Sequence, residues 1–185
     1  MDETVKLLTQ FGAAVASVSA VGTTPVHLAA GAGHTSILRF LLGEPGGSAR
    51  LGDNDGLAPV HFAATGGHAT CLRLLASNFG ADLSARDNDG LAPVHAAALR
   101  GHDDVLRYLV AEGGCDASST DFEGETPLHV ACAEGRASTA WLLVAELGAN
   151  VGARNKAGLT AADLAREEGH ADVLESLVEA SSTGD

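Results

Sequence analysis

Several sets of positions in this chain recur every 34 residues. Prolines stand at positions 25, 59, 93 and 127, and the residue two places beyond each of them is a histidine. Glycines follow in the same register at 33, 67, 101, 135 and 169, and all but one of these precede another histidine. The nonapeptide DNDGLAPVH occurs twice, at 53–61 and 87–95. A fixed period of this length is typical of repeat architectures, in which one small supersecondary unit stacks on the next.

Each period predicts two short helices. The segments TPVHLAA, APVHFAA, APVHAAA and TPLHVAC place proline at the first position of a helix, where its missing N–H is not needed. The glycine at 33, 67, 101 or 135 is expected to end this helix in a left-handed conformation. A second helix is predicted in TSILRFLL, ATCLRLLA, DDVLRYLV and ASTAWLLV. Clusters such as DNDG and DFEG between units predict tight hairpin tips.

The pattern G-x-[TA]-P-[VL]-H-x-A, followed by G-H and a leucine-rich second helix, resembles the ankyrin repeat family over nearly the whole chain. The resemblance implies an all-α ankyrin-repeat solenoid of helix-turn-helix units joined by short β-hairpin loops. Ankyrin units usually have 33 residues; the extra residue here falls where the second helix ends, and should lengthen that helix or loosen its exit. Ala58 and Ala92 replace a capping threonine that is retained as Thr24 and Thr126, which typically costs about 1 kcal/mol per helix.

The register divides the chain into an expected series of segments. These are a partial N-terminal repeat with a second helix and loop (1–21), full repeats at 22–53, 54–87, 88–121 and 122–155, a C-terminal capping repeat (156–180) and a tail (181–185). The partial repeat is inferred from FGAAV at 11–15, which lies 68 positions before FGADL at 79–83. Its missing first helix leaves open whether the chain is full length or part of a longer protein.

Composition narrows the class of partner and the compartment. The formal net charge is −13, with 24 acidic and 11 basic side chains, and the basic residues are scattered, which argues against nucleic acid and anionic membranes. No stretch approaches the roughly 20 apolar residues that span a bilayer. Asp2 and Glu3 argue against a signal peptide. Three cysteines in no metal-type spacing favour a reducing compartment, the cytoplasm or alternatively the nucleus.

Neither histidines nor cysteines predict a catalytic, cofactor or metal site. All eight histidines occupy repeat-register positions, and a column with one histidine per repeat would be spaced by about 10 Å, too far for a shared ion. The resemblance implies that the histidines after the prolines bond locally and bridge neighbouring hairpins. Cys71 and Cys132 fall at apolar helix positions and are expected in the core, whereas Cys115 is expected to be the most accessible thiol.

The surface predicts where a partner binds. The hairpin tips carry a row of carboxylates: Asp53, Asp55, Asp87, Asp89, Asp121, Glu123 and Glu125. This row serves either solubility alone or the steering of a basic partner. First-helix residues expected on the concave side include Leu28, Phe62 and Val130, and Phe62 with Leu99 is a candidate anchor. Trp141 breaks a column of arginines and either folds onto the neighbouring repeat or contacts another protein.

The leading hypothesis is therefore a non-catalytic, monomeric protein–protein interaction module. Its partner would be another protein or peptide of basic and apolar character, bound by hairpin tips and the concave first-helix surface. The candidate partner-binding residues are Asp55, Leu57, Phe62, Asp89, Leu91, Leu99, Arg100, Glu123, Glu125, Glu134 and Trp141. The alternative is a regulatory or targeting segment of a larger enzyme or channel.

Overall fold

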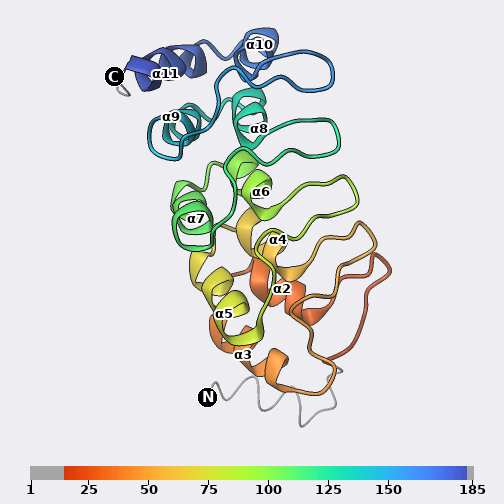
Figure 1. Ribbon diagram of the computed structural model, residues 1–185. Coiled ribbons are helices and arrows are strands. Elements are labelled where there is room, and N and C mark those ends of the chain that lie inside the picture. Colours follow the sequence, from red (N-terminus) through yellow and green to blue (C-terminus); the bar gives the residue numbers. More distant parts are fainter. Residues whose placement is uncertain (1–14, 183–185) are drawn as a thin grey trace. The chain divides into compact units, whose positions relative to one another are not determined.

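The protein consists of short helices in pairs, as Figure 1 shows for the computed structural model, which describes residues 15–182. The first helices of the pairs are α2 (Pro25–Gly31), α4 (Pro59–Thr65), α6 (Pro93–Arg100), α8 (Pro127–Ala133) and α10 (Ala161–Glu167). The second helices are α3 (Thr35–Gly43), α5 (Ala69–Phe79), α7 (Asp103–Arg107), α9 (Ala137–Ala145) and α11 (Ala171–Ser182). A π-helical turn, η1 (Tyr108–Glu112), continues α7. Residues 15–182 contain no strand, so the all-helical prediction is confirmed for them.

The first helices begin at the positions that the repeat register predicts. The N–H of the residue before each proline is satisfied by the histidine three places later: Thr126 N–H donates to His129 Nδ1 at 3.2 Å. The Thr126 hydroxyl also accepts a hydrogen bond from the His129 N–H. In α10 the same arrangement uses Asp163, which accepts from the N–H and the hydroxyl of Thr160, and these bonds lower the pKa of Asp163.

The glycines between the two helices of a pair adopt the left-handed conformation expected of them. Gly33, Gly67, Gly101 and Gly135 have φ between 69° and 77°. In this region a side chain would clash with the backbone, so glycine is the residue that ends a helix there. The sharp turn lets the second helix fold back beside the first.

The exits of the second helices absorb the additional residue in different ways. α5 runs for 11 residues and ends at Phe79. In the next repeat the Gly113 N–H donates to the Tyr108 carbonyl at 2.8 Å, which is the i→i+5 bond of a π-turn. Leu147 N–H makes the equivalent bond to the Leu142 carbonyl at 3.1 Å, after α9. The expectation was a longer second helix or a looser exit; α5 has 11 residues, and the π-turn bonds follow the second helices of the next two repeats.

The chain divides into two compact units, and each is described by itself. Unit 1 extends to Asn88 and unit 2 begins at Asp89, close to the predicted boundary between the second and third full repeats. In unit 1, α2 packs on α4 and α3 on α5, around Val26, Leu38, Val60, Leu72 and Leu75. In unit 2, α8 packs between α6 and α10, and α9 packs against α7 and α11. Most of the predicted partial repeat at 1–21 lies outside the described residues.

Candidate protein-interaction surface

Four histidines, one on each of four first helices, are almost fully buried. They are His27, His61, His95 and His129. Each accepts a hydrogen bond at Nδ1 from the N–H at the start of its own helix, over 3.0–3.2 Å. Because Nδ1 accepts, the proton of the neutral ring lies on Nε2, which is then a donor. The four Nδ1 atoms are thus bonded to the backbone at the start of their own helices.

In unit 2 the Nε2 atoms reach the hairpin loop of the next repeat. His95 Nε2 lies 3.0 Å from the Ser119 carbonyl and 3.2 Å from the Glu125 carbonyl. His129 Nε2 lies 3.1 Å from the Leu159 carbonyl. The buried histidines therefore fasten a helix to the following loop, as the resemblance implied.

His27 in unit 1 is the exception. Its Nε2 is buried without a hydrogen-bond partner, although the carbonyls of Leu51 and Leu57 lie close enough to act on it electrostatically. Burial lowers the pKa of His27, and it prevails over Asp53 and the two carbonyls, which raise it. Neutral His27 is thus the form that the fold prefers.

His170, which follows the glycine at 169, bonds in the opposite direction, to the preceding repeat. His170 Nε2 lies 3.1 Å from the Ala133 carbonyl. Arg136, the one non-histidine in this register, donates from Nε to the Leu99 carbonyl at 3.0 Å. The arginine therefore makes the same contact as the histidine, one period earlier.

The cysteines lie in the interior. Burial raises the pKa of the Cys132 thiol to about 12, and it also raises the pKa of Cys71, against a smaller effect of Thr35. Cys115 is the most accessible of the three thiols, as predicted, but at 5% exposed it is buried like Cys71 and Cys132, which are 0% exposed. The Cys115 N–H donates to the Leu109 carbonyl at 2.9 Å, which folds the residue back against the end of the second helix. Among residues 15–182, no three His, Cys, Asp or Glu side chains are grouped so as to hold a metal ion.

Two of the predicted tip carboxylates shape the loops that carry them. Asp53 Oδ1 accepts from the N–H groups of Asp55 and Leu57, and Asp121 Oδ1 accepts from those of Glu123 and Glu125. Such bonds close a tight turn. One oxygen of each carboxylate is therefore hydrogen-bonded within its own loop, so Asp53 and Asp121 have less capacity to bind a partner than a free carboxylate has.

The remaining predicted tip residues differ in how far they reach solvent. Asp55, Asp89 and Glu123 are exposed, whereas Leu57, Leu91 and Glu125 are half-buried. Glu125 accepts a hydrogen bond from the Asn155 amide at 3.3 Å. Neighbouring tips are joined through the backbone, since Asn88 N–H donates to the Asp55 carbonyl and Phe122 N–H to the Asp89 carbonyl.

The predicted first-helix anchor is divided between the two units. Phe62 is half-buried in unit 1, where its ring meets that of His27 edge-on at a centroid distance of 5.0 Å. Leu99 is half-buried in unit 2. Their action as one pair stays a prediction. Arg100 and Glu134 are exposed, and Val130, expected on the concave side, is 9% exposed.

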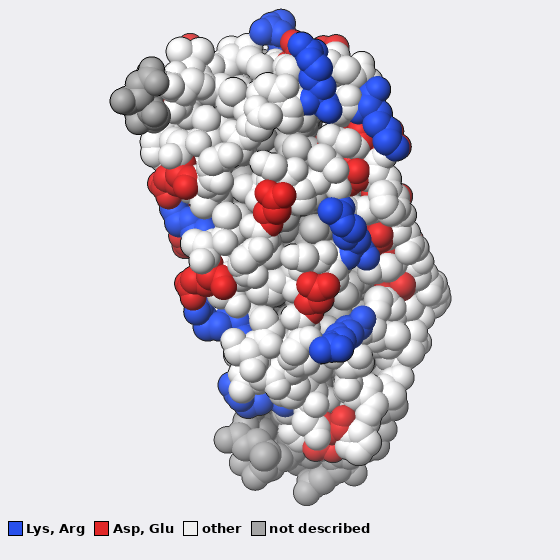
Figure 2. All heavy atoms as spheres, in the orientation of Figure 1, with Lys and Arg blue, Asp and Glu red and all other residues white. Residues whose placement is uncertain are grey.

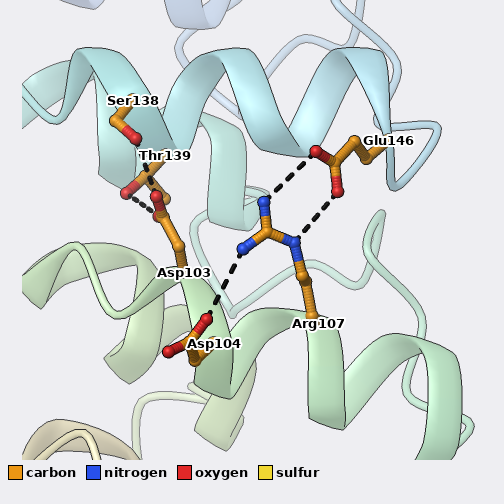
Figure 3. A network of polar contacts seen from close by, with 6 residues as sticks. All are labelled: Asp103, Asp104, Arg107, Ser138, Thr139 and Glu146. Carbon is orange, nitrogen blue, oxygen red and sulfur yellow. Dashed lines mark hydrogen bonds and ion pairs between the residues drawn. The ribbon is translucent and has the colours of Figure 1, made fainter.

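The outer helices of unit 2 are joined by the polar network of Figure 3. Arg107 on α7 makes two hydrogen bonds to the Glu146 carboxylate beyond α9, at 3.0 and 3.2 Å, and lies 3.5 Å from Asp104. This pairing lowers the pKa of Glu146. Trp141, on α9, is half-buried, so neither of the two alternatives for its role is settled.

Several exposed apolar side chains were not predicted from the sequence. In unit 1 they are Val18, Val21 and Leu51, and in unit 2 they are Phe122, Val151 and Val178. The exposure of Val21 could have been predicted from the repeat register. Asp55, Asp89 and Glu123 occupy the same position in later repeats, and such charged residues are typical of an exposed position. On the face shown in Figure 2, acidic and basic side chains are interspersed among uncharged ones.

Comparison with known proteins agrees with this architecture. The family model of ankyrin repeats in three copies matches residues 1–87, 79–155 and 95–184. The chain belongs to the ankyrin repeat family. Ankyrin repeats are general protein-interaction modules and are typically non-catalytic. No match was found among curated proteins. Within residues 15–182, every helix is too short or too polar to cross a membrane.

Proposed function

We propose that this chain is a non-catalytic module that binds another protein through its hairpin tips and first-helix surface. The observation that carries the proposal is that buried and exposed side chains have different roles. The buried histidines bond to the backbone of the fold, whereas Asp55, Asp89 and Glu123 are exposed on the tips. Outward charged and apolar side chains are what a binding surface uses.

The partner proposed is basic and apolar in character. A net charge of −13 repels anionic partners and attracts cationic ones, and half-exposed Phe62 and Leu99 supply apolar contact area. Charge-steered binding weakens as ionic strength rises. We further propose that the chain acts as a monomer in the cytoplasm or, alternatively, the nucleus. Its three cysteines are unpaired and buried, which suits a reducing compartment.

The test is affinity purification with the whole chain as bait, followed by mass spectrometry and by titration of each purified candidate. A specific partner is expected to bind the wild type and to lose affinity with Phe62→Ala combined with Leu99→Ala. Each single variant shows which unit contributes. Far-UV circular dichroism checks that the helices persist. Unchanged affinity for the double variant would move the surface elsewhere, and Trp141→Ala would be titrated next. Failure to find any saturable partner would refute the module function.

A further inference from the structure

Unit 1 exposes large aliphatic side chains at positions where unit 2 does not. Val18 is 59% exposed, Val21 60%, Leu28 62% and Leu51 48%. In the 34-residue register the residues of unit 2 at these positions are Thr120 and Arg154 for Val18, Asp89, Glu123 and Ala157 for Val21, Ala96, Val130 and Leu164 for Leu28, and Ser119 and Ala153 for Leu51. Of these, Val130 is buried and Leu164 is half-buried, and the others are polar residues or alanines. The same architecture therefore presents a different chemical surface in unit 1.

These side chains belong to neighbouring segments. The Asn54 N–H donates to the Val21 carbonyl at 3.1 Å, and the Asn54 amide donates to the Ala20 carbonyl at 3.1 Å, so the first tip lies against the second. Leu51 approaches His27 through its carbonyl, and Leu28 follows His27 on α2. Val18, Val21, Leu28 and Leu51 are called the unit 1 apolar surface below.

The loop that carries Leu51 lacks the histidine hydrogen bond that joins the equivalent loops of unit 2 to the preceding first helix. His95 and His129 donate from Nε2 to carbonyls of the loops that follow them, but buried His27 Nε2 has no partner. A hydrogen bond left unmade in a buried site is costly. A ligand that presses the 48–57 loop toward α2 would bring the Leu51 and Leu57 carbonyls closer to this donor.

The charges beside the unit 1 apolar surface are negative. Asp55 is exposed on the tip that follows Leu51, and Asp53 lies at the start of the same tip. The cation nearest in sequence, Arg50, donates to the Gly80 carbonyl from both Nε and NH2, at 3.0 and 2.6 Å. A complementary ligand therefore pairs apolar side chains with a positive charge.

We propose that the unit 1 apolar surface binds a partner segment that presents two or more large apolar side chains next to a lysine or arginine, which pairs with Asp55. Binding draws the 48–57 loop onto His27. This inference rests on the proposed function and adds the unit that carries the apolar contact and the chemistry of the bound segment.

The experiment selects ligands from random 12-residue peptides displayed on phage, with the whole chain immobilised. Enriched peptides are synthesised and titrated by fluorescence anisotropy against the wild type and Leu28→Gln combined with Leu51→Gln. Val178→Gln is the matched control, because Val178 is 72% exposed on α11 of unit 2. Asp55→Asn tests the charge. Circular dichroism confirms that each variant keeps its helices.

The expected peptides combine apolar residues with lysine or arginine. Their affinity should fall by about tenfold or more in the double leucine variant, fall less in Asp55→Asn, and stay unchanged in Val178→Gln. Peptides that bind the wild type and the double leucine variant equally would overturn the inference and leave the module function intact. A selection that yields no saturable peptide would count against the inference and the proposed function together.

Discussion

The hydroxyl of Thr139 lies 2.6 Å from the carboxylate of Asp103, and this contact joins the start of α9 to the start of α7 (Figure 3). Thr139 is 1% exposed, and Ser138 donates to the other oxygen of the same carboxylate at 2.7 Å. One carboxylate at the beginning of a second helix thus holds the beginning of the next second helix. The Arg107–Glu146 pair joins the same two repeats near their other ends.

Thr139→Val should destabilise the protein although it preserves the shape of the side chain. It removes a charge-assisted hydrogen bond in a buried position, and the free energy of unfolding should fall by about 1–3 kcal/mol. Ser138→Ala is the control, since exposed Ser138 should change stability by only about 0.5 kcal/mol. Urea unfolding followed by circular dichroism measures both. Equal losses in the two variants would contradict this account of the contact.

Ala58→Thr and Ala92→Thr should each stabilise the protein. These alanines precede α4 and α6 without a side-chain acceptor, whereas Thr126 accepts from the N–H at the third position of α8. Restoring that cap should add about 0.5–2 kcal/mol per helix. Differential scanning calorimetry should show higher midpoints for both variants. Ala58→Val and Ala92→Val supply the added bulk without the hydroxyl, and a similar gain with valine would attribute the effect to packing.

Stability should decline when the pH falls below about 6.5, the ordinary pKa of histidine. Because burial lowers the pKa of His27 in the folded protein, the unfolded chain binds a proton at a higher pH than the folded one does. The resulting stabilisation is complete above the unfolded pKa and is lost as the pH falls through the folded pKa. Urea unfolding between pH 7.5 and 5 measures this loss. His27→Gln should show a shallower decline, and an identical decline in both proteins would exclude His27 as its source.

The three thiols should resist alkylation in the native protein. Cys71, Cys115 and Cys132 are all buried, and the raised pKa values of Cys71 and Cys132 keep these two protonated at neutral pH. Intact-mass spectrometry after iodoacetamide at pH 8 should show slow labelling, with full labelling of three sites once urea is added. Rapid native labelling of Cys115 would contradict its burial.

The repeat register was sufficient to predict the positions of the helices. Proline at 25, 59, 93 and 127 and glycine at 33, 67, 101 and 135 mark where first helices begin and end, because each residue has a backbone conformation suited to that position. The burial of single side chains was less predictable. Leu28 and Val130 occupy the same register position, yet one is 62% exposed and the other 9%. Burial depends on neighbouring side chains, which the period does not specify.

The repeat register also did not predict which residues form hydrogen bonds between repeats. Nothing in the sequence distinguishes His27 from His95, but only in His95 do the following loop carbonyls come within hydrogen-bond distance of Nε2. Arg136 stands where the other repeats have histidine, and it makes the contact that His170 makes one period later. Both outcomes depend on how the side chain and the neighbouring backbone are placed, which residue identity alone does not determine.

The Nε2 donors of His95 and His129 recognise the next loop only by its main-chain oxygen. The residues that provide those oxygens are a serine, a glutamate and a leucine, so side-chain identity is irrelevant to the bond. Loop sequences can accordingly diversify while the joint between repeats is retained. This separation allows new specificity to evolve, or to be engineered, on a scaffold whose assembly is left untouched.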